Sequence, residues 1–162
     1  MHAQKAKAYA RMHDRHKAEV ELEAVRSVLN SVPMPSNVRD HFTVDPTKAS
    51  FYAMDTYRVA GIDGLADAMA DTVIATSTRG DGTVISPMRL AEAQLTKAVL
   101  LARNGDPGGA MRVADNALTH SRRSAPSLLL VANEVAADVG RSSKAAGAAF
   151  RHHIAAITAK TA

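Results

Sequence analysis

The stretch of sequence that decides the fold runs from Ser86 to Ser121 and reads SPMRLAEAQLTKAVLLARNGDPGGAMRVADNALTHS. It holds two segments in which apolar residues recur every three or four positions, the spacing that places them on one face of a helix. A serine–proline pair precedes the first segment and an aspartate–proline pair precedes the second, as is typical of helix starts. Gly105 lies between the segments and indicates a tight turn. The stretch therefore predicts two helices, 87–104 and 107–121, joined by a glycine turn.

The same start and stop signals recur along the whole chain. They predict further helices over 3–12, 14–31, 46–60, 63–77, 126–139 and 143–160. The segments 36–44 and 78–85 are predicted to be loops, and no segment favours a β-strand. Turns are expected near residues 13, 61, 105 and 140, so that the helices form successive hairpins.

Composition narrows the class of protein. A length of 162 residues fits one domain, and 46% apolar with 22% charged residues excludes a disordered chain. The low aromatic content of 4% and the abundant alanine disfavour sandwiches and barrels. The absence of cysteine excludes disulfides and thiolate chemistry. No apolar run approaches membrane-spanning length and the first residues lack a signal-peptide core, so we expect a cytoplasmic protein.

The net charge of +4 is unevenly spread, with basic ends and an acidic middle. Solvated helix faces explain this layout, and nucleic-acid contact or self-association is the alternative. No recognition motif for DNA is present, so we expect no direct sequence-specific DNA binding by this chain alone.

The spacing of the turns indicates a repeat. Gly105 and Gly140 are 35 residues apart, close to the period of tetratricopeptide repeats. The segment 91–118 resembles one tetratricopeptide unit, with Ala98, Ala110 and Ala117 where that family has small residues. The aromatic residues of the family's first helix are missing. This resemblance implies an all-α fold: a tetratricopeptide-like right-handed α-solenoid of antiparallel helix pairs, with about seven or eight helices, as one domain over 1–162.

A second resemblance is narrower. The segments 86–106 and 122–132 are similar to the helical C-terminal sensor region of actinobacterial XRE-type helix-turn-helix transcriptional regulators. Those regulators carry an N-terminal helix-turn-helix domain, which is absent from this sequence. The resemblance therefore implies either a sensor region separated from its DNA-binding domain or a stand-alone relative.

The sequence contains no recognisable motif for catalysis. The segment 105–109 lacks the lysine and hydroxyl residue of a phosphate-binding loop, and the histidines lack chelating spacing. No nucleophile–base pair is apparent. We therefore expect no enzymatic activity, no cofactor and no metal site. Four methionines at helical core spacing are interpreted as core residues, with an adaptable ligand groove as the alternative: Met54, Met69, Met88 and Met111.

In a solenoid of this kind, the first helix of each pair lines the concave side. The candidate ligand- or partner-binding residues, called the predicted groove residues below, are Phe51, Asp55, Tyr57, Arg58, Arg89, Glu92, Leu95, Val99, Arg103, Ser127, Leu130 and Glu134. Arginines would bind a carboxylate and the acids an amine, as suits an extended peptide. The alternative is that these charges are simply solvated.

These observations favour a non-enzymatic binding module, the sensor and dimerisation part of a transcriptional regulator. Its partner would be a peptide, a small molecule or a protein, and it could form a homodimer. Ligand binding would shift the population of solenoid curvatures. The alternative is a structural adaptor or oligomerisation scaffold without a small ligand.

Overall fold

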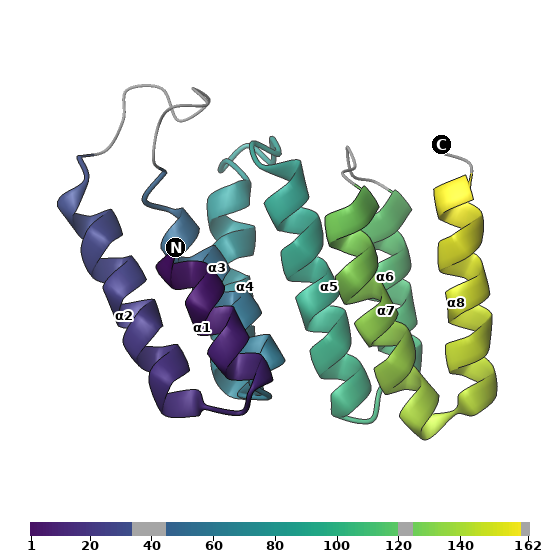
Figure 1. Ribbon diagram of the computed structural model, residues 1–162. Coiled ribbons are helices and arrows are strands. Elements are labelled where there is room, and N and C mark those ends of the chain that lie inside the picture. The colour runs from purple at the N-terminus through teal and green to yellow at the C-terminus, as the bar shows by residue number, and fades with distance from the viewer. Residues whose placement is uncertain (34–44, 120–124, 160–162) are drawn as a thin grey trace. The chain divides into compact units, whose positions relative to one another are not determined.

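The described part of the chain is all-helical. The computed structural model describes residues 1–33, 45–119 and 125–159, and no strand occurs within these ranges (Figure 1). The predicted loop 36–44 lies outside the described residues. The helices that the structure describes are α1 (His2–Arg11), α2 (Arg15–Ser31), α3 (Lys48–Val59), α4 (Asp63–Ser77), α5 (Pro87–Arg103), α6 (Pro107–Thr119), α7 (Ala125–Ser142) and α8 (Lys144–Ala159).

Side-chain caps explain several helix starts. The Asp14 carboxylate accepts the backbone N–H of Lys17 at 3.1 Å, and the Asp106 carboxylate accepts the backbone N–H of Gly109 at 2.7 Å. Such bonds satisfy amide groups that have no partner inside the helix. Both aspartates are predicted from the sequence as caps, and the structure confirms them. Ser86, also predicted as a cap, makes no side-chain capping bond at the start of α5.

The turns between consecutive helices differ in geometry. Gly61 and Gly105 have φ angles of 70° and 85°, the left-handed region that glycine adopts without strain. Gly140 does not belong to a turn: α7 continues to Ser142, and the break before α8 falls at Ser143. This corrects the expected position of the last turn. The predicted loop 78–85 has one isolated β-bridge, between Thr78 and Val84.

The chain divides into two compact units, Met1–Thr72 and Val73–Ala162, with the boundary inside α4. In the first unit, α1 packs against α2, and both pack against α3 (Figure 1). Alanine is the commonest buried apolar residue described in this unit, and Met54 has the largest side chain that is fully buried. A single continuous domain over 1–162 stays a prediction.

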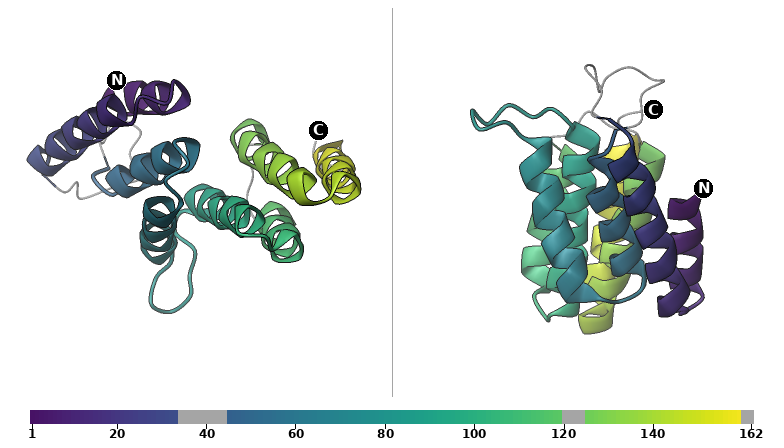
Figure 2. Two further views of the ribbon diagram at one scale, coloured as in Figure 1. Left: turned by 90° about the horizontal axis from the view of Figure 1, so that it is seen from below. Right: turned by 90° about the vertical axis from the view of Figure 1, so that its left-hand side faces the viewer.

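The second unit has a larger apolar core. In it α5 packs against α6 and α7, and α7 packs against α8, as the nearly end-on view in Figure 2 shows. One cluster of buried residues runs through these four helices and includes Leu95, Val99, Leu128 and Val135. Gly147 of α8 lies against Gly140 of α7, where an added Cβ would be 2.6 Å from the Gly140 Cα. The glycine at 147 therefore allows close approach of α7 and α8, and Gly140 lies inside α7 rather than in a turn.

Candidate ligand-binding site

Two of the predicted groove residues in the second unit bond to each other. Arg103 of α5 donates from Nη2 to Glu134 of α7 at 2.9 Å and from Nε to Asp138 of α7 at 2.9 Å. Asp138 also accepts from Arg141, and its side chain is only 5% exposed. The sequence predicts both Arg103 and Glu134 as ligand-binding groove residues. Their side chains, however, bond to each other and so link α5 to α7.

A similar cluster joins helices in the first unit. Asp55 of α3 bonds to Lys7 of α1 and to Arg58, one turn further along α3. The Arg58 side chain is 4% exposed and that of Asp55 is 12% exposed. Removing a buried charge from water is unfavourable unless an opposite charge compensates it, and the carboxylate does so here. Asp55, predicted to face a ligand, therefore links α3 to α1 through Lys7, while Arg58, also predicted to face a ligand, bonds to Asp55 along α3.

The other predicted groove residues differ in exposure. Leu95 and Val99 are fully buried in the core of the second unit, which corrects their predicted place on an exposed stripe. Their burial follows from α5 being covered by both α6 and α7. Leu130 is 68% exposed. Ser127 lies in α7, with its side chain outside the described residues. The half-buried members are Phe51, Tyr57, Arg89 and Glu92.

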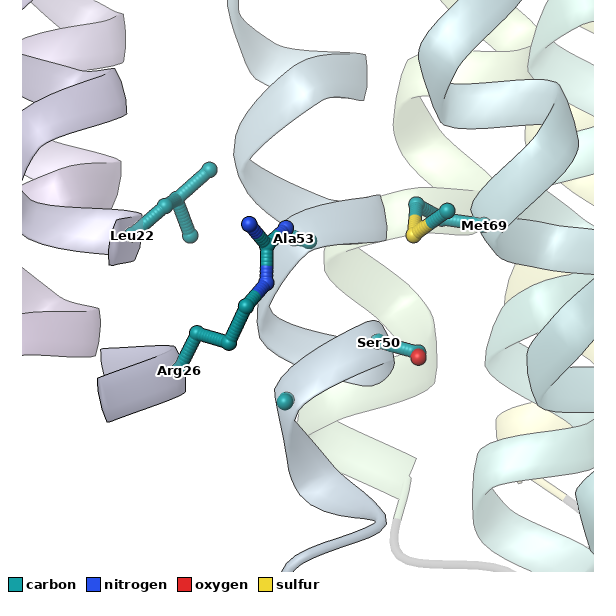
Figure 3. A pocket seen from close by; sticks show the side chains of 6 residues that line it. Leu22, Arg26, Ser50, Ala53 and Met69 are labelled. Atoms are coloured by element: carbon teal, nitrogen blue, oxygen red, sulfur yellow. The ribbon is translucent and has the colours of Figure 1, made fainter. Parts of the chain in front are cut away.

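The structure also shows a cleft that is not on the predicted groove. The cleft lies in the first unit between α2, α3 and α4, and it contains about 290 Å³ of space, part of which is open to solvent. Its lining residues are Leu22, Arg26, Ala49, Ser50, Ala53 and Met69. Figure 3 shows Arg26 extending from α2 across the opening, with Met69 on the α4 side. We call it the α2–α3–α4 cleft.

The floor of this cleft is apolar and its rim is cationic. Leu22 and Ala53 are 6% and 5% exposed and belong to one apolar cluster, against which Met69 packs. The Arg26 side chain is 53% exposed, and its Nη1 donates to Glu23 on the same helix at 2.7 Å. The cleft can thus hold an apolar group on its floor and an anionic group at its rim.

Sequence reasoning missed Arg26, although it follows Leu22 by one helical turn and so borders the buried stripe of α2. Met69 did give a signal, since the adaptable-groove alternative for the methionines includes it. Met54, in contrast, is fully buried, while Met88 and Met111 pack against the larger core. Of these four residues, the structure places Met69 at a cleft.

Polar contacts near the cleft fix α1 against α2. His2 lies 2.5 Å from Glu21, and Lys5 is 3.8 Å from the same carboxylate. The hydrogen bond from His2, with a smaller effect of the Lys5 charge, lowers the pKa of Glu21 below its usual value. Glu21 therefore stays ionised at neutral pH and contributes to the α1–α2 contact as an anion.

Within the described residues, no group of three or more acidic or histidine side chains is arranged to hold a metal ion. The same part of the chain has no helix with the length and apolar character that crossing a bilayer requires. The cytoplasmic location expected from the sequence stays a prediction.

The chain matches no protein-family model, and neither the curated proteins nor the solved structures give a significant match. The class of the protein is therefore defined by its own features: an all-α fold in the described residues, ion pairs that link α1 to α3 and α5 to α7, and a small cleft in the first unit.

Proposed function

We propose that this chain is a non-enzymatic helical-repeat module that binds a peptide segment of a partner protein. Its helices would form antiparallel pairs that stack as a tetratricopeptide-like, right-handed solenoid. The contacts inside each unit support this arrangement, because α1 packs against α3 and α5 against α7. In a repeat protein, each helix pair buries its apolar face against the next pair in this way.

The α2–α3–α4 cleft is the observation that carries the proposal. Sites for drug-sized ligands and cofactors enclose roughly 300–1,000 Å³. The enclosed part of the cleft is far smaller than these sites, because the 290 Å³ of the cleft includes open solvent, and its floor is apolar. A space of this size suits one side chain of a peptide better than a whole cofactor. The peptide proposal thus agrees with the size of the site and with its mixed lining.

The predicted groove residues contribute differently to this function. Asp55, Arg58, Arg103 and Glu134 are bonded between or along helices, so they set how successive first helices pack. Peptide binding near α3 would act on that packing. As the sensor part of an XRE-type regulator, the module would pass such a change to an attached DNA-binding domain or to a partner.

Selection from a random peptide library tests this function. The purified full chain is exposed to a displayed library of 12-residue peptides, half of it with free carboxyl termini. We expect enrichment of a shared sequence whose synthetic peptide binds in the micromolar range, about −8 kcal/mol. A library in which no sequence is enriched over a control without protein contradicts the proposal.

An oligomerisation scaffold is the second candidate, and one observation favours it. Leu130 of α7 is 68% exposed, and contact with a second copy of the chain would remove this aliphatic side chain from water. Sedimentation of the wild type and of Leu130→Gln separates the candidates. A dimer that the substitution weakens supports the scaffold, and a monomer at all concentrations and salt levels rejects it.

A further inference from the structure

The α2–α3–α4 cleft has both apolar and cationic lining residues. Leu22, Ala53 and Met69 give it an apolar floor, and the Arg26 guanidinium lies at its opening (Figure 3). Ser50, on the first turn of α3, adds a hydroxyl to the same lining. A ligand that uses the whole cleft must therefore carry an aliphatic group and an anion close together.

Arg26 is available to such an anion. Its salt bridge with Glu23 is a surface pair three residues apart on one helix, with the two side chains 53% and 67% exposed. Pairs of this kind contribute only about 0.5 kcal/mol, since water and salt screen them and the side chains lose freedom. A carboxylate held by additional apolar contacts can displace Glu23, which then turns into solvent. Arginine suits this role because its planar guanidinium bonds both carboxylate oxygens at once.

The floor favours a branched aliphatic side chain. The thioether side chain of Met69 is flexible and polarizable, and so adapts to the shape of the group beside it. The volume leaves no room for an aromatic cofactor. An internal aspartate or glutamate offers a carboxylate but uses its own side chain to do so, leaving the floor empty. The last residue of a chain offers both an aliphatic side chain and an α-carboxylate.

We propose that the α2–α3–α4 cleft binds the C-terminal residue of a partner peptide, with the aliphatic side chain on Leu22, Ala53 and Met69 and the α-carboxylate on Arg26. This inference rests on the proposed peptide-binding function and specifies its ligand. The Ser50 hydroxyl donates a hydrogen bond to the second carboxylate oxygen or to the last peptide group.

Fluorescence polarization with the full chain tests the inference. The probes are two fluorescein-labelled hexapeptides ending in leucine, identical except that one has a free carboxylate and the other a C-terminal amide. We expect the carboxylate peptide to bind about ten-fold more tightly, as is typical of one charge-assisted hydrogen-bonded pair. Arg26→Gln should remove this difference, and Arg26→Lys should restore only part of it.

Arg15→Gln is the matched control. Arg15 also lies on α2, is 62% exposed and pairs with a glutamate of its own helix, but it is not part of the cleft. This variant should keep the full preference for the free carboxylate. Circular dichroism of each variant checks that the helices remain folded.

The outcomes separate the two proposals. Equal binding of the two peptides, or an unchanged preference in Arg26→Gln, overturns the inference while peptides enriched from the library still support the proposed function. Competition by octanoate as strong as that by the unlabelled peptide also overturns it, because the ligand would then be a free aliphatic acid. If neither the hexapeptides nor any library peptide binds, both proposals fail.

Discussion

The two units join their helices with the same kind of cluster at different depths. In each, one nearly buried aspartate bonds a cation on an earlier helix and another three residues further along its own: Asp55 with Lys7 and Arg58, and Asp138 with Arg103 and Arg141. In the first unit the arginine on the aspartate's own helix is 4% exposed, whereas the one in the second unit is 69% exposed. The arginines that follow the two aspartates thus differ most in burial, and water screens an exposed ion pair more than a buried one.

The units differ again in their apolar packing. The second unit has a connected core in which leucine, valine, phenylalanine and isoleucine pack among alanines, and its α7 and α8 meet at Gly140 and Gly147. The small cluster at the cleft of the first unit consists of Ala6, Leu22 and Ala53, with Tyr57 and Met69 against it. Small side chains leave space that larger ones would fill, and the α2–α3–α4 cleft lies where this packing is sparse.

Substituting the two aspartates tests whether burial of the paired arginine strengthens the ion pair. This prediction has the largest expected effect. Asp55→Ala leaves the buried Arg58 guanidinium without this carboxylate, and we expect it to lower the free energy of unfolding by about 3 kcal/mol. Asp138→Ala should cost less, about 1–2 kcal/mol, because Arg141 and part of Arg103 can be hydrated. Urea unfolding followed by circular dichroism measures both. A larger loss of stability for Asp138→Ala than for Asp55→Ala would contradict this explanation.

A methyl group at the glycine contact tests the tight packing of the second unit. In Gly147→Ala the new Cβ would lie 2.6 Å from the Gly140 Cα and 2.7 Å from the Ala136 carbonyl oxygen, so α8 must shift. We expect a loss of about 2 kcal/mol. Gly108→Ala in α6 is the matched control, since its Cβ meets nothing nearer than 3.6 Å. The control should gain about 0.5 kcal/mol from helix propensity. Equal effects in thermal unfolding would reject the close contact.

Thr96→Val tests the cost of a buried polar group in the same core. Thr96 is fully buried on α5, and its hydroxyl oxygen has no hydrogen-bond partner among the described residues. A buried hydroxyl without a partner has lost its water and gained no replacement. The substitution keeps the shape and removes this penalty, so stability should rise by about 1 kcal/mol. A fall in the urea midpoint would show that the hydroxyl is satisfied in solution.

The smallest expected effect concerns pH and the first unit. Hydrogen bonds from the Lys17 side chain and backbone N–H lower the pKa of Asp14 below its usual 3.8. The folded state then binds this proton less readily than the unfolded state. The stabilisation is therefore complete above the usual pKa and is lost as the pH falls through the lowered value.

Asp14→Asn isolates this contribution, because asparagine keeps the capping oxygen but not the charge. The stability difference between wild type and variant should shrink as the pH falls from about 5 to about 2. Unfolding curves at several pH values measure it. A difference that does not change with pH would assign the cap to hydrogen bonding alone.

Much of the fold could be predicted from local signals. The caps Asp14 and Asp106 and the turn glycines at 61 and 105 act on their own neighbours, so the sequence shows them directly. Gly140 was misassigned to a turn because it lies inside α7, against Gly147 of another helix, and local sequence does not show that contact. A glycine needed for helix contact and one needed for a turn look alike in a sequence.

The candidate site was less predictable. Helical spacing predicts Arg103 and Glu134 as groove residues, but it does not show whether two charges bind a ligand or each other. The α2–α3–α4 cleft needs three helices to meet, and Arg26, Ser50 and Met69 come from three separate segments. Its residue types are those of any amphipathic helix. Only the packing of these helices distinguishes them.

We expect a peptide to bind at the α2–α3–α4 cleft and not at the ion pairs that Arg103 of α5 forms with Glu134 and Asp138 of α7. Titration of the ¹⁵N-labelled full chain with the free-carboxylate leucine peptide, followed by nuclear magnetic resonance, tests it most directly. We predict that the largest amide shift changes fall on Leu22, Arg26, Ser50, Ala53 and Met69. Changes centred instead on Arg103 and Glu134, with the cleft amides unmoved, would contradict it.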